Sequence, residues 1–393
     1  MSSSGYRPLL RTPGAAAFFL TAAVGRVGIA MTGLGLVWLL HARTGSYATA
    51  GLATAGFALA EALIGPQVAR LIDRRGQSRV LPFALLAHAA AIAVVLTSST
   101  PAVAITAATC AGAAVPQLGA LSGARWAHLL REQRADELPS AFSLESLANA
   151  TAFLLGPVLV TTLGALGDTT LASLIAVGLI TGGGGALAAQ RRTEPAPASA
   201  YAGGTERTLL RPSFLRLAAL NLAIGLYFGT IGISVSAFAV GHGVPGAAAG
   251  IMAASSISGL LSGWLYGLRP RRFPAYRQLV VTTGWLTIAG LMLPIAPGPI
   301  WLGAAIVVTE LAVPPTLVLL NVLTQKTVHP AALTQAFTWN NSTSAASSAL
   351  AASLAGRAAD GFGASAALAL APAAGLILLV LAVWGLLRSA AEG

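Results

Sequence analysis

Runs of 18 or more predominantly apolar residues recur along almost the whole of this 393-residue chain. Each run is long enough to cross the ~30 Å hydrocarbon core of a bilayer. The chain is 55% hydrophobic and only 9% charged, whereas roughly a quarter of the residues in soluble domains are charged. No soluble core could bury so much apolar surface. The sequence therefore predicts a protein that crosses a membrane many times.

A membrane-length window gives about twelve candidate spans. The first run is too long for the core of a signal peptide and has no soluble domain behind it, so we expect it to be retained as a helix. The expected fold class is an all-α membrane protein. The spans fall near residues 15–40, 47–69, 80–98, 102–127, 140–166, 169–189, 213–240, 244–268, 276–295, 299–325, 331–357 and 363–387.

An even number of spans places both termini on one side of the membrane. With the N-terminus inside, most of the 23 Lys and Arg residues fall in loops on that side, including Arg207, Arg269, Arg271 and Arg272. Arg43 is the one loop arginine on the opposite side. Because basic loops stay in the cytoplasm, we expect cytoplasmic termini and a multi-pass protein of the cell membrane. Topology also explains the net charge of +11 without a nucleic-acid partner.

The longest polar interruption covers residues 190–212 and is rich in Pro, Gly and Ser, which is typical of a flexible linker. Six spans precede it and six follow. An offset of 198 residues also superposes Gly45 on Gly243 and Gly65 on Gly263. These observations predict an N-terminal six-helix bundle over 1–189, a cytoplasmic linker over 190–212 and a C-terminal six-helix bundle over 213–393.

A tight basic turn separates the second and third spans. It resembles the loop between the second and third helices of major facilitator superfamily (MFS) transporters. Ala69 stands where Gly is usual, and Gln77 and Ser78 occupy positions that are usually basic. Glycine permits the sharp reversal, arginines hold the turn in the cytoplasm, and the acid can pair with them or cap a helix. A topology signal alone is the alternative. The positions that fit are Ala69, Asp73, Arg74, Gly76 and Arg79.

The resemblance covers the whole chain in layout. It implies two six-helix bundles that rock around a site near the middle of the membrane, with the third, sixth, ninth and twelfth helices outside the central cavity. Those four spans contain no charged residue in their interiors. A charge at mid-bilayer costs about 2.5–3.5 kcal/mol on the lenient insertion scale, so charges in the other spans should face protein or water.

Four ionisable residues lie inside spans: Arg26, Glu61, Glu145 and Glu310. At 1.5 Å per residue, Arg26 and Glu310 each lie roughly 16 Å from the start of their span, near the midplane. We expect Glu310 to be the proton-responsive group. Arg26 either orients a substrate carboxylate or phosphate, or neutralises a cavity glutamate.

Glu61 and Glu145 lie nearer the cytoplasmic ends. They complete the proton-coupling candidates, although pairing with Arg125 or the turn arginines is nearly as well supported. For Arg357 and Asp360, at the outer end of the eleventh span, i,i+3 pairing is preferred. His88 is outside the presumed cavity and is interpreted as structural. Uncharged cavity candidates, each also explicable as packing between helices, are Gln117, Asn149, Asn221, Asn321, Asn340 and Asn341.

Gly156 and Pro157 in the fifth span resemble part of the Gly-Pro pattern of antiporter branches of the family, and proline predicts a kink there. The chain departs from drug-proton antiporters in two places. Residues 106–112 lack the arginine usual early in the fourth span, and Asn149 stands where the fifth span tends to be acidic. Both departures weigh against proton coupling.

Several function classes lack their motifs. Lys326 has no phosphate-loop frame, there is no Gly-x-Ser-x-Gly or His-Glu-x-x-His, and five scattered histidines with one cysteine form no metal pattern. We expect no enzyme and no cofactor. The favoured function is proton-coupled export of an amphipathic small molecule by a single-chain transporter. The alternatives are uptake of a small metabolite and a non-transporting sensor or scaffold.

Overall fold

The computed structural model describes residues 6–131, 134–197, 209–268 and 273–391. Within these ranges the chain is all-α and contains no strand, which confirms the expected fold class. The first helices are α1 (Tyr6–Arg11), α2 (Ala15–Thr44), α3 (Tyr47–Arg75), α4 (Gln77–Thr97), α5 (Pro101–Ala114), α6 (Leu118–Leu129), α7 (Leu138–Ala165) and α8 (Thr169–Ala189). The remaining helices are α9 (Pro212–Gly241), α10 (Ala247–Leu268), α11 (Ala275–Gly290), α12 (Pro299–Glu310), α13 (Val313–Thr327), α14 (Leu333–Phe362) and α15 (Ala364–Ala391).

Every expected span coincides with a helix or with a broken pair of helices, and ten of them are long and apolar enough to cross a membrane. The two exceptions have physical causes. α11 has only 16 residues and ends five residues before the expected boundary at 295, where Pro294 has no N–H to continue a helix. α14 has 30 residues but is rich in Asn, Ser and Thr between 338 and 348.

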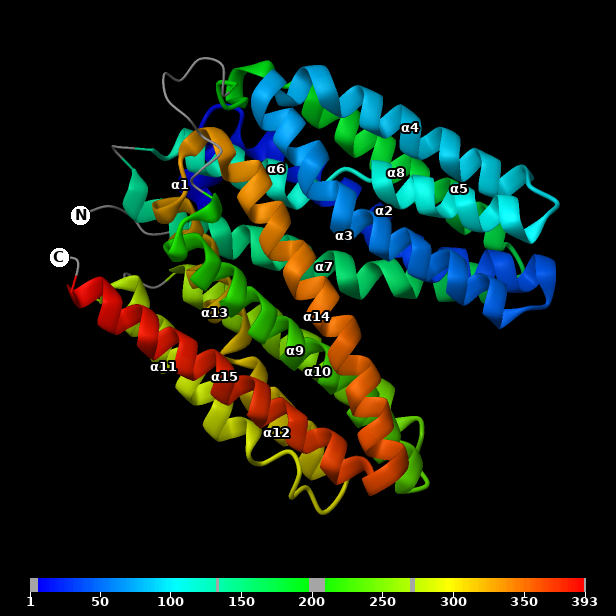
Figure 1. Cartoon of the computed structure of the whole chain (residues 1–393), viewed down its shortest axis with the longest axis vertical. Helices are drawn as coiled ribbons and strands as arrows, with labels where there is room; N and C mark the ends of the chain where they lie inside the picture. The colour runs from blue at the N-terminus through cyan, green and yellow to red at the C-terminus, as the bar shows by residue number, and fades with distance from the viewer. Residues whose placement is uncertain (1–5, 132–133, 198–208, 269–272, 392–393) are drawn as a thin grey trace.

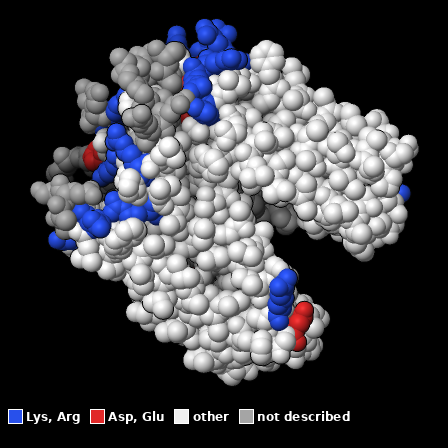
Figure 2. All heavy atoms as spheres, viewed as in Figure 1, with Lys and Arg blue, Asp and Glu red and all other residues white. Residues whose placement is uncertain are grey.

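The helices form two groups, α2 to α8 and α9 to α15, that meet at one end of the molecule and separate at the other (Figure 1). The end where they meet also carries α1 and the last turns of α15. Side chains from both groups share one buried core there, including Phe142 of α7 and Phe337 of α14, whose rings are 5.7 Å apart. Most visible Lys and Arg side chains lie at this end, and a deep cleft opens at the opposite end (Figure 2).

We call the end with α1 and most basic residues the basic end. Arg207, Arg269, Arg271 and Arg272, which the sequence assigns to the same face, lie outside the described residues. So do residues 198–208 of the expected linker. The division into bundles at 189 and 213 therefore stays a prediction.

Candidate functional site

Two of the spans are broken near their middle. In the fourth span α5 ends at Ala114 and α6 begins at Leu118, with Pro116 between them. In the tenth span α12 ends at Glu310 and α13 begins at Val313, followed by Pro314 and Pro315. Proline has no N–H, so each break leaves backbone carbonyls without their usual partners four residues on.

The freed carbonyls are met by ring N–H groups from neighbouring helices. His88 Nδ1 of α4 lies 2.9 Å from Ala111 O, and because a carbonyl can only accept, this nitrogen carries the hydrogen. Trp285 Nε1 of α11 donates to Val308 O at the same distance, 2.9 Å. Each residue of the second bond lies 197 positions after its counterpart in the first. The two breaks therefore occupy corresponding places in the two halves.

Serines of α10 satisfy two further carbonyls at the second break. Ser258 donates to Val307 O at 2.9 Å, and Ser262 donates to Leu311 O. The carbonyl of Leu311 would normally face the N–H of residue 315, which is a proline. Interrupted helices at matching positions of two halves are where transporters place binding sites, so the residues at these breaks define the candidate site.

At the first break, Gln117 faces an acid. Its Nε2 donates to Glu61 Oε1 at 2.8 Å, and both side chains are half-buried. Gly65 lies one turn from Glu61, and a methyl group built on it would be 3.6 Å from Thr338 Cγ2 of α14 and 3.9 Å from Gln117 Nε2. Glu61 is therefore positioned where α3, the break and a helix of the other half come together.

At the second break, the acid is the last residue of α12. Glu310 is half-buried and hydrogen-bonded to Ser255 of α10. A methyl group at Gly259 would lie 3.2 Å from its Oε1, so α10 passes close beside the carboxyl group. The hydroxyl of Tyr227, which is 1% exposed, donates to the adjacent Thr309 at 3.1 Å. The partners of Glu310 are thus uncharged, like those of Glu61.

Arg26 has a protein partner. Its guanidinium forms an ion pair with Glu145 and also donates to the backbone oxygen of Glu145 at 3.2 Å. Ser122 and Trp126 donate to Glu145 Oε1 at 2.6 and 2.8 Å. Arg26 and Glu145 are 5% and 7% exposed. This arrangement matches the neutralising alternative for Arg26, and it gives Glu145 a different partner from the expected Arg125 or turn arginines.

The five asparagine candidates differ in their surroundings. Asn149 and Asn341 are exposed, and Asn321 is half-buried. Asn221 donates to Leu217 O of its own helix at 2.8 Å, as a packing residue would. Asn340 is 2% exposed and donates to Thr324 Oγ1 at 2.9 Å, while its Oδ1 has no partner.

The basic turn joins the two halves at the basic end. Asp73 Oδ2 accepts from the N–H of Gln335, in the first turn of α14, at 2.9 Å. Gly76 has φ +97°, a conformation that favours glycine. A methyl group there would also lie 2.7 Å from Glu194 Oε1, which accepts from Ser78 N. Arg74 and Arg79 are exposed.

Sequence reasoning missed the residue that organises this turn. Arg125 is completely buried, and it donates to Gln77 Oε1 at 2.7 Å and to Thr193 Oγ1 at 2.9 Å. It also donates to the backbone oxygens of Leu187 and Gln190. Gln77, which departs from the family pattern, is thus an acceptor for a buried guanidinium, a role no basic residue could fill.

Two other expectations concern single helices. α7 continues as one helix through Pro157, and Gly156 packs so closely on α2 that a methyl group would lie 2.8 Å from Ala30 Cβ. The kink therefore stays a prediction, and close packing explains the glycine. Arg357 and Asp360 are both exposed. No ion pair between them is recorded in the described part of α14, contrary to the preferred pairing.

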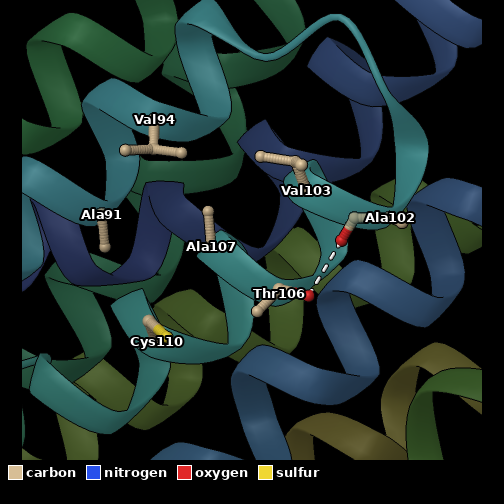
Figure 3. Close-up of a pocket in the computed structure, with 7 residues that line it drawn as sticks. All are labelled: Ala91, Val94, Ala102, Val103, Thr106, Ala107 and Cys110. Carbon is tan, nitrogen blue, oxygen red and sulfur yellow. Dashed lines mark hydrogen bonds between the residues drawn. The ribbon is translucent and has the colours of Figure 1, made fainter.

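A hollow of about 420 Å³ lies between α4 and α5 (Figure 3). Its lining is almost entirely apolar. The one hydroxyl group, of Thr106, is already bonded to Ala102 O at 2.9 Å. None of the candidate residues lines it, so this hollow is not the candidate site.

Removal of the ring N–H of His88 or of Trp285 should lower the stability of the fold by a similar amount. We expect His88→Leu to lower the free energy of unfolding by about 1–3 kcal/mol, since it leaves the buried carbonyl of Ala111 unpaired. Trp285→Phe should have a similar effect, because no water in the bilayer core can replace the donor to Val308 O. Thermal unfolding of the purified protein measures this. Trp301→Phe is the matched control. It makes the same substitution at an indole for which no hydrogen bond is recorded among the described residues. Equal effects of Trp285→Phe and Trp301→Phe would contradict the assigned role.

Comparison with known proteins gives one family and several similar folds. The model of the Major Facilitator Superfamily matches residues 18–352. No curated protein matched the chain. Among solved structures, the human organic anion transporter MFSD10 (TETRAN) is 14% identical, with 94% of this chain and 98% of that chain covered at a TM-score of 0.72.

Two bacterial structures are similar to the same degree. A bacterial homologue of the iron transporter ferroportin, in an outward-facing state, is 15% identical with a TM-score of 0.75, and 94% of this chain and 98% of that one are covered. The transporter FucP, an E. coli fucose:proton symporter, in its outward conformation is 12% identical with a TM-score of 0.72, and the shares are 95% and 99%. At such identities the likeness concerns the fold.

Proposed function

The chain belongs to the Major Facilitator Superfamily, and from this premise we propose that it exports an amphipathic small molecule in exchange for protons. It is a multi-pass membrane transporter, not an enzyme. The structures it resembles are those of an organic anion transporter, a bacterial homologue of an iron transporter and a fucose:proton symporter. The fold therefore leaves the transported molecule and the direction of transport open. Our proposal for the transported molecule and the direction of transport therefore rests on the residues of this chain.

One observation carries alternating access: the two groups of helices are joined at the basic end and separated at the other (Figures 1 and 2). At the basic end, hydrogen bonds join α1 and the first group to the second group. Asp73 accepts from Gln335 N, Ser140 of α7 donates to Gly267 O of α10 at 2.7 Å, and Tyr6 of α1 donates to Trp264 O at 2.7 Å. With the basic end in the cytoplasm, this is an outward-open state.

Proton coupling is supported by the carboxyl groups at the two breaks. Glu61 and Glu310 are partnered by an amide and a hydroxyl group, neither of which supplies positive charge. A neighbouring cation would hold a carboxyl group in its charged form, and neither glutamate has one among its recorded partners. Each can therefore take up a proton on one side of the membrane and release it on the other.

Flux in proteoliposomes under an imposed pH gradient tests the proposal. The purified chain is reconstituted and assayed with cationic, neutral and anionic amphipathic compounds. Movement of a compound against the inward proton gradient is expected for export by exchange. Movement with the protons would favour the uptake alternative, and the absence of driven flux for every compound would favour the sensor or scaffold.

The contact of Asp73 with α14 should act as a latch at the basic end. An acid at a helix N-terminus is worth up to ~2 kcal/mol, so its loss shifts a conformational balance by about thirtyfold at most. We expect Asp73→Asn to slow turnover and to raise the cytoplasmic labelling of a cysteine at Asn321 in a Cys110→Ser background.

Asp136→Asn is the control for this latch variant, because Asp136 is exposed at the same end on the short helix η1 (Ala135–Glu137). Normal turnover with unaltered labelling in Asp73→Asn would leave the turn as a topology signal alone.

A further inference from the structure

The ionisable groups within the spans are unequally supplied with partners. Arg26 and Glu145 form one neutral pair, further held by Ser122 and Trp126. Arg125 is surrounded by four oxygen acceptors at the basic end. Two carboxyl groups remain, Glu61 and Glu310, whose recorded partners are all uncharged.

We propose that the transported molecule is an organic cation, recognised by the carboxyl groups of Glu61 and Glu310 at the two helix breaks. The inference rests on the proposed function and adds the chemical class of the cargo. It also reverses the expectation that Arg26 would select an anion, because that guanidinium is occupied by Glu145.

Among the described residues, no basic side chain on the helices packed against α3 forms an ion pair with Glu61. The ionisable groups on the helices packed against α3 are Arg26, His41, Arg43, Arg79, His88, Cys110, Arg357 and Asp360. Arg26 is paired with Glu145, and His88 is bonded to Ala111 O. The arginines at 43, 79 and 357 belong to the ends of their helices, whereas Glu61 is in the middle of α3.

The same holds at Glu310. The other ionisable groups on α10, α12 and the helices packed against them are Glu145, Arg216, Tyr227, Tyr266, Tyr276, Arg277 and Lys326, and His242 follows directly after α9. Glu145 is paired with Arg26. The cations Arg216, Arg277 and Lys326 belong to the ends of their helices, whereas residue 310 lies at the break in the middle of the tenth span. Tyr227 lies beside this break, because its hydroxyl donates to Thr309 Oγ1 at 3.1 Å.

The arrangement suits an organic cation better than a metal ion. Calcium takes six to eight oxygen ligands and structural zinc takes four donors. Here each half presents one carboxyl group with one amide or hydroxyl beside it. Within the described residues no three His, Cys, Asp or Glu side chains are grouped to hold a metal. A single carboxylate pairs well with an ammonium, amidinium or phosphonium centre.

Matched hydrophobic ions test the sign of the charge. Equilibrium binding of radiolabelled tetraphenylphosphonium to the full chain in detergent is measured, with tetraphenylborate as the anion of the same shape. We expect the phosphonium to bind more tightly. Glu61→Gln and Glu310→Gln should each weaken its binding by about tenfold or more, while Asp136→Asn leaves it unchanged. Acidification should weaken it too, because protons compete for the same oxygens.

Three results would overturn the inference: no phosphonium binding, borate binding as tight as phosphonium binding, or both glutamine variants behaving like the wild type. Size-exclusion profiles and Glu310→Asp, which retains the charge, separate loss of the site from loss of the fold. Driven flux of only a neutral or anionic compound in the pH-gradient assay would contradict cation recognition and support proton-driven export. Phosphonium binding without driven flux of any compound would support cation recognition and contradict proton-driven export.

Discussion

Glu310→Gln is expected to reduce proton-driven transport to the level of protein-free vesicles. Glutamine keeps the size of the side chain and an oxygen that can accept from Ser255, so the packing of α12 against α10 should persist. Its amide group does not take up or release a proton as a carboxyl group does. Flux under an imposed pH gradient is the measurement, and passive exchange of substrate without a gradient should remain detectable, although with weaker binding.

Two further variants serve as controls for Glu310→Gln. Glu310→Asp should retain part of the driven flux, because a titratable group remains at the break. Asp136→Asn should transport normally, because it removes an exposed acid from the basic end. Undiminished uphill transport by Glu310→Gln would remove this residue from the coupling mechanism and leave Glu61 as the carboxyl group to test.

Arg26→Leu is expected to destabilise the protein by about 3–5 kcal/mol, because it leaves the carboxylate of Glu145 buried without its cation. The double variant Arg26→Leu with Glu145→Gln should regain most of this loss. Glutamine carries no charge, and its oxygen can still accept from Ser122 and Trp126. Denaturant unfolding of the single and double variants measures the coupling between the two positions.

A substrate-binding Arg26 would behave differently. In that case, Arg26→Leu would abolish binding of an anionic substrate with little change in stability, and Glu145→Gln would not rescue it. Additive losses of stability in the double variant would therefore contradict the pairing seen in the structure.

Features of the sequence that act locally predicted the fold well. Run length and apolarity placed the spans, since they alone decide whether a helix can cross the bilayer. The position of Glu310 in the middle of its span followed from counting residues along the apolar run. The partner of Arg26 could not be predicted in this way. Glu145 is 119 residues away in the chain, and several other acids could have paired with Arg26.

The breaks had a signal that went unused. Pro116 and the pair Pro314-Pro315 lie inside apolar runs, and proline there frees carbonyls that something must satisfy. Which helix supplies the donor depends on packing between distant segments. The role of Arg125 was hidden for the same reason, since its acceptors come from α4, α8 and the segment after α8.

His88 and Trp285 differ in size, shape and basicity and share little beyond a ring N–H that meets a carbonyl 2.9 Å away. If both halves descend from one duplicated ancestral gene, the amino acid has drifted while the donor has persisted. Superposing the donor and acceptor pairs of the two halves would then show their common origin better than aligning their amino-acid sequences. Divergent relatives could be placed in register by asking which side chain, of whatever kind, serves each interrupted helix.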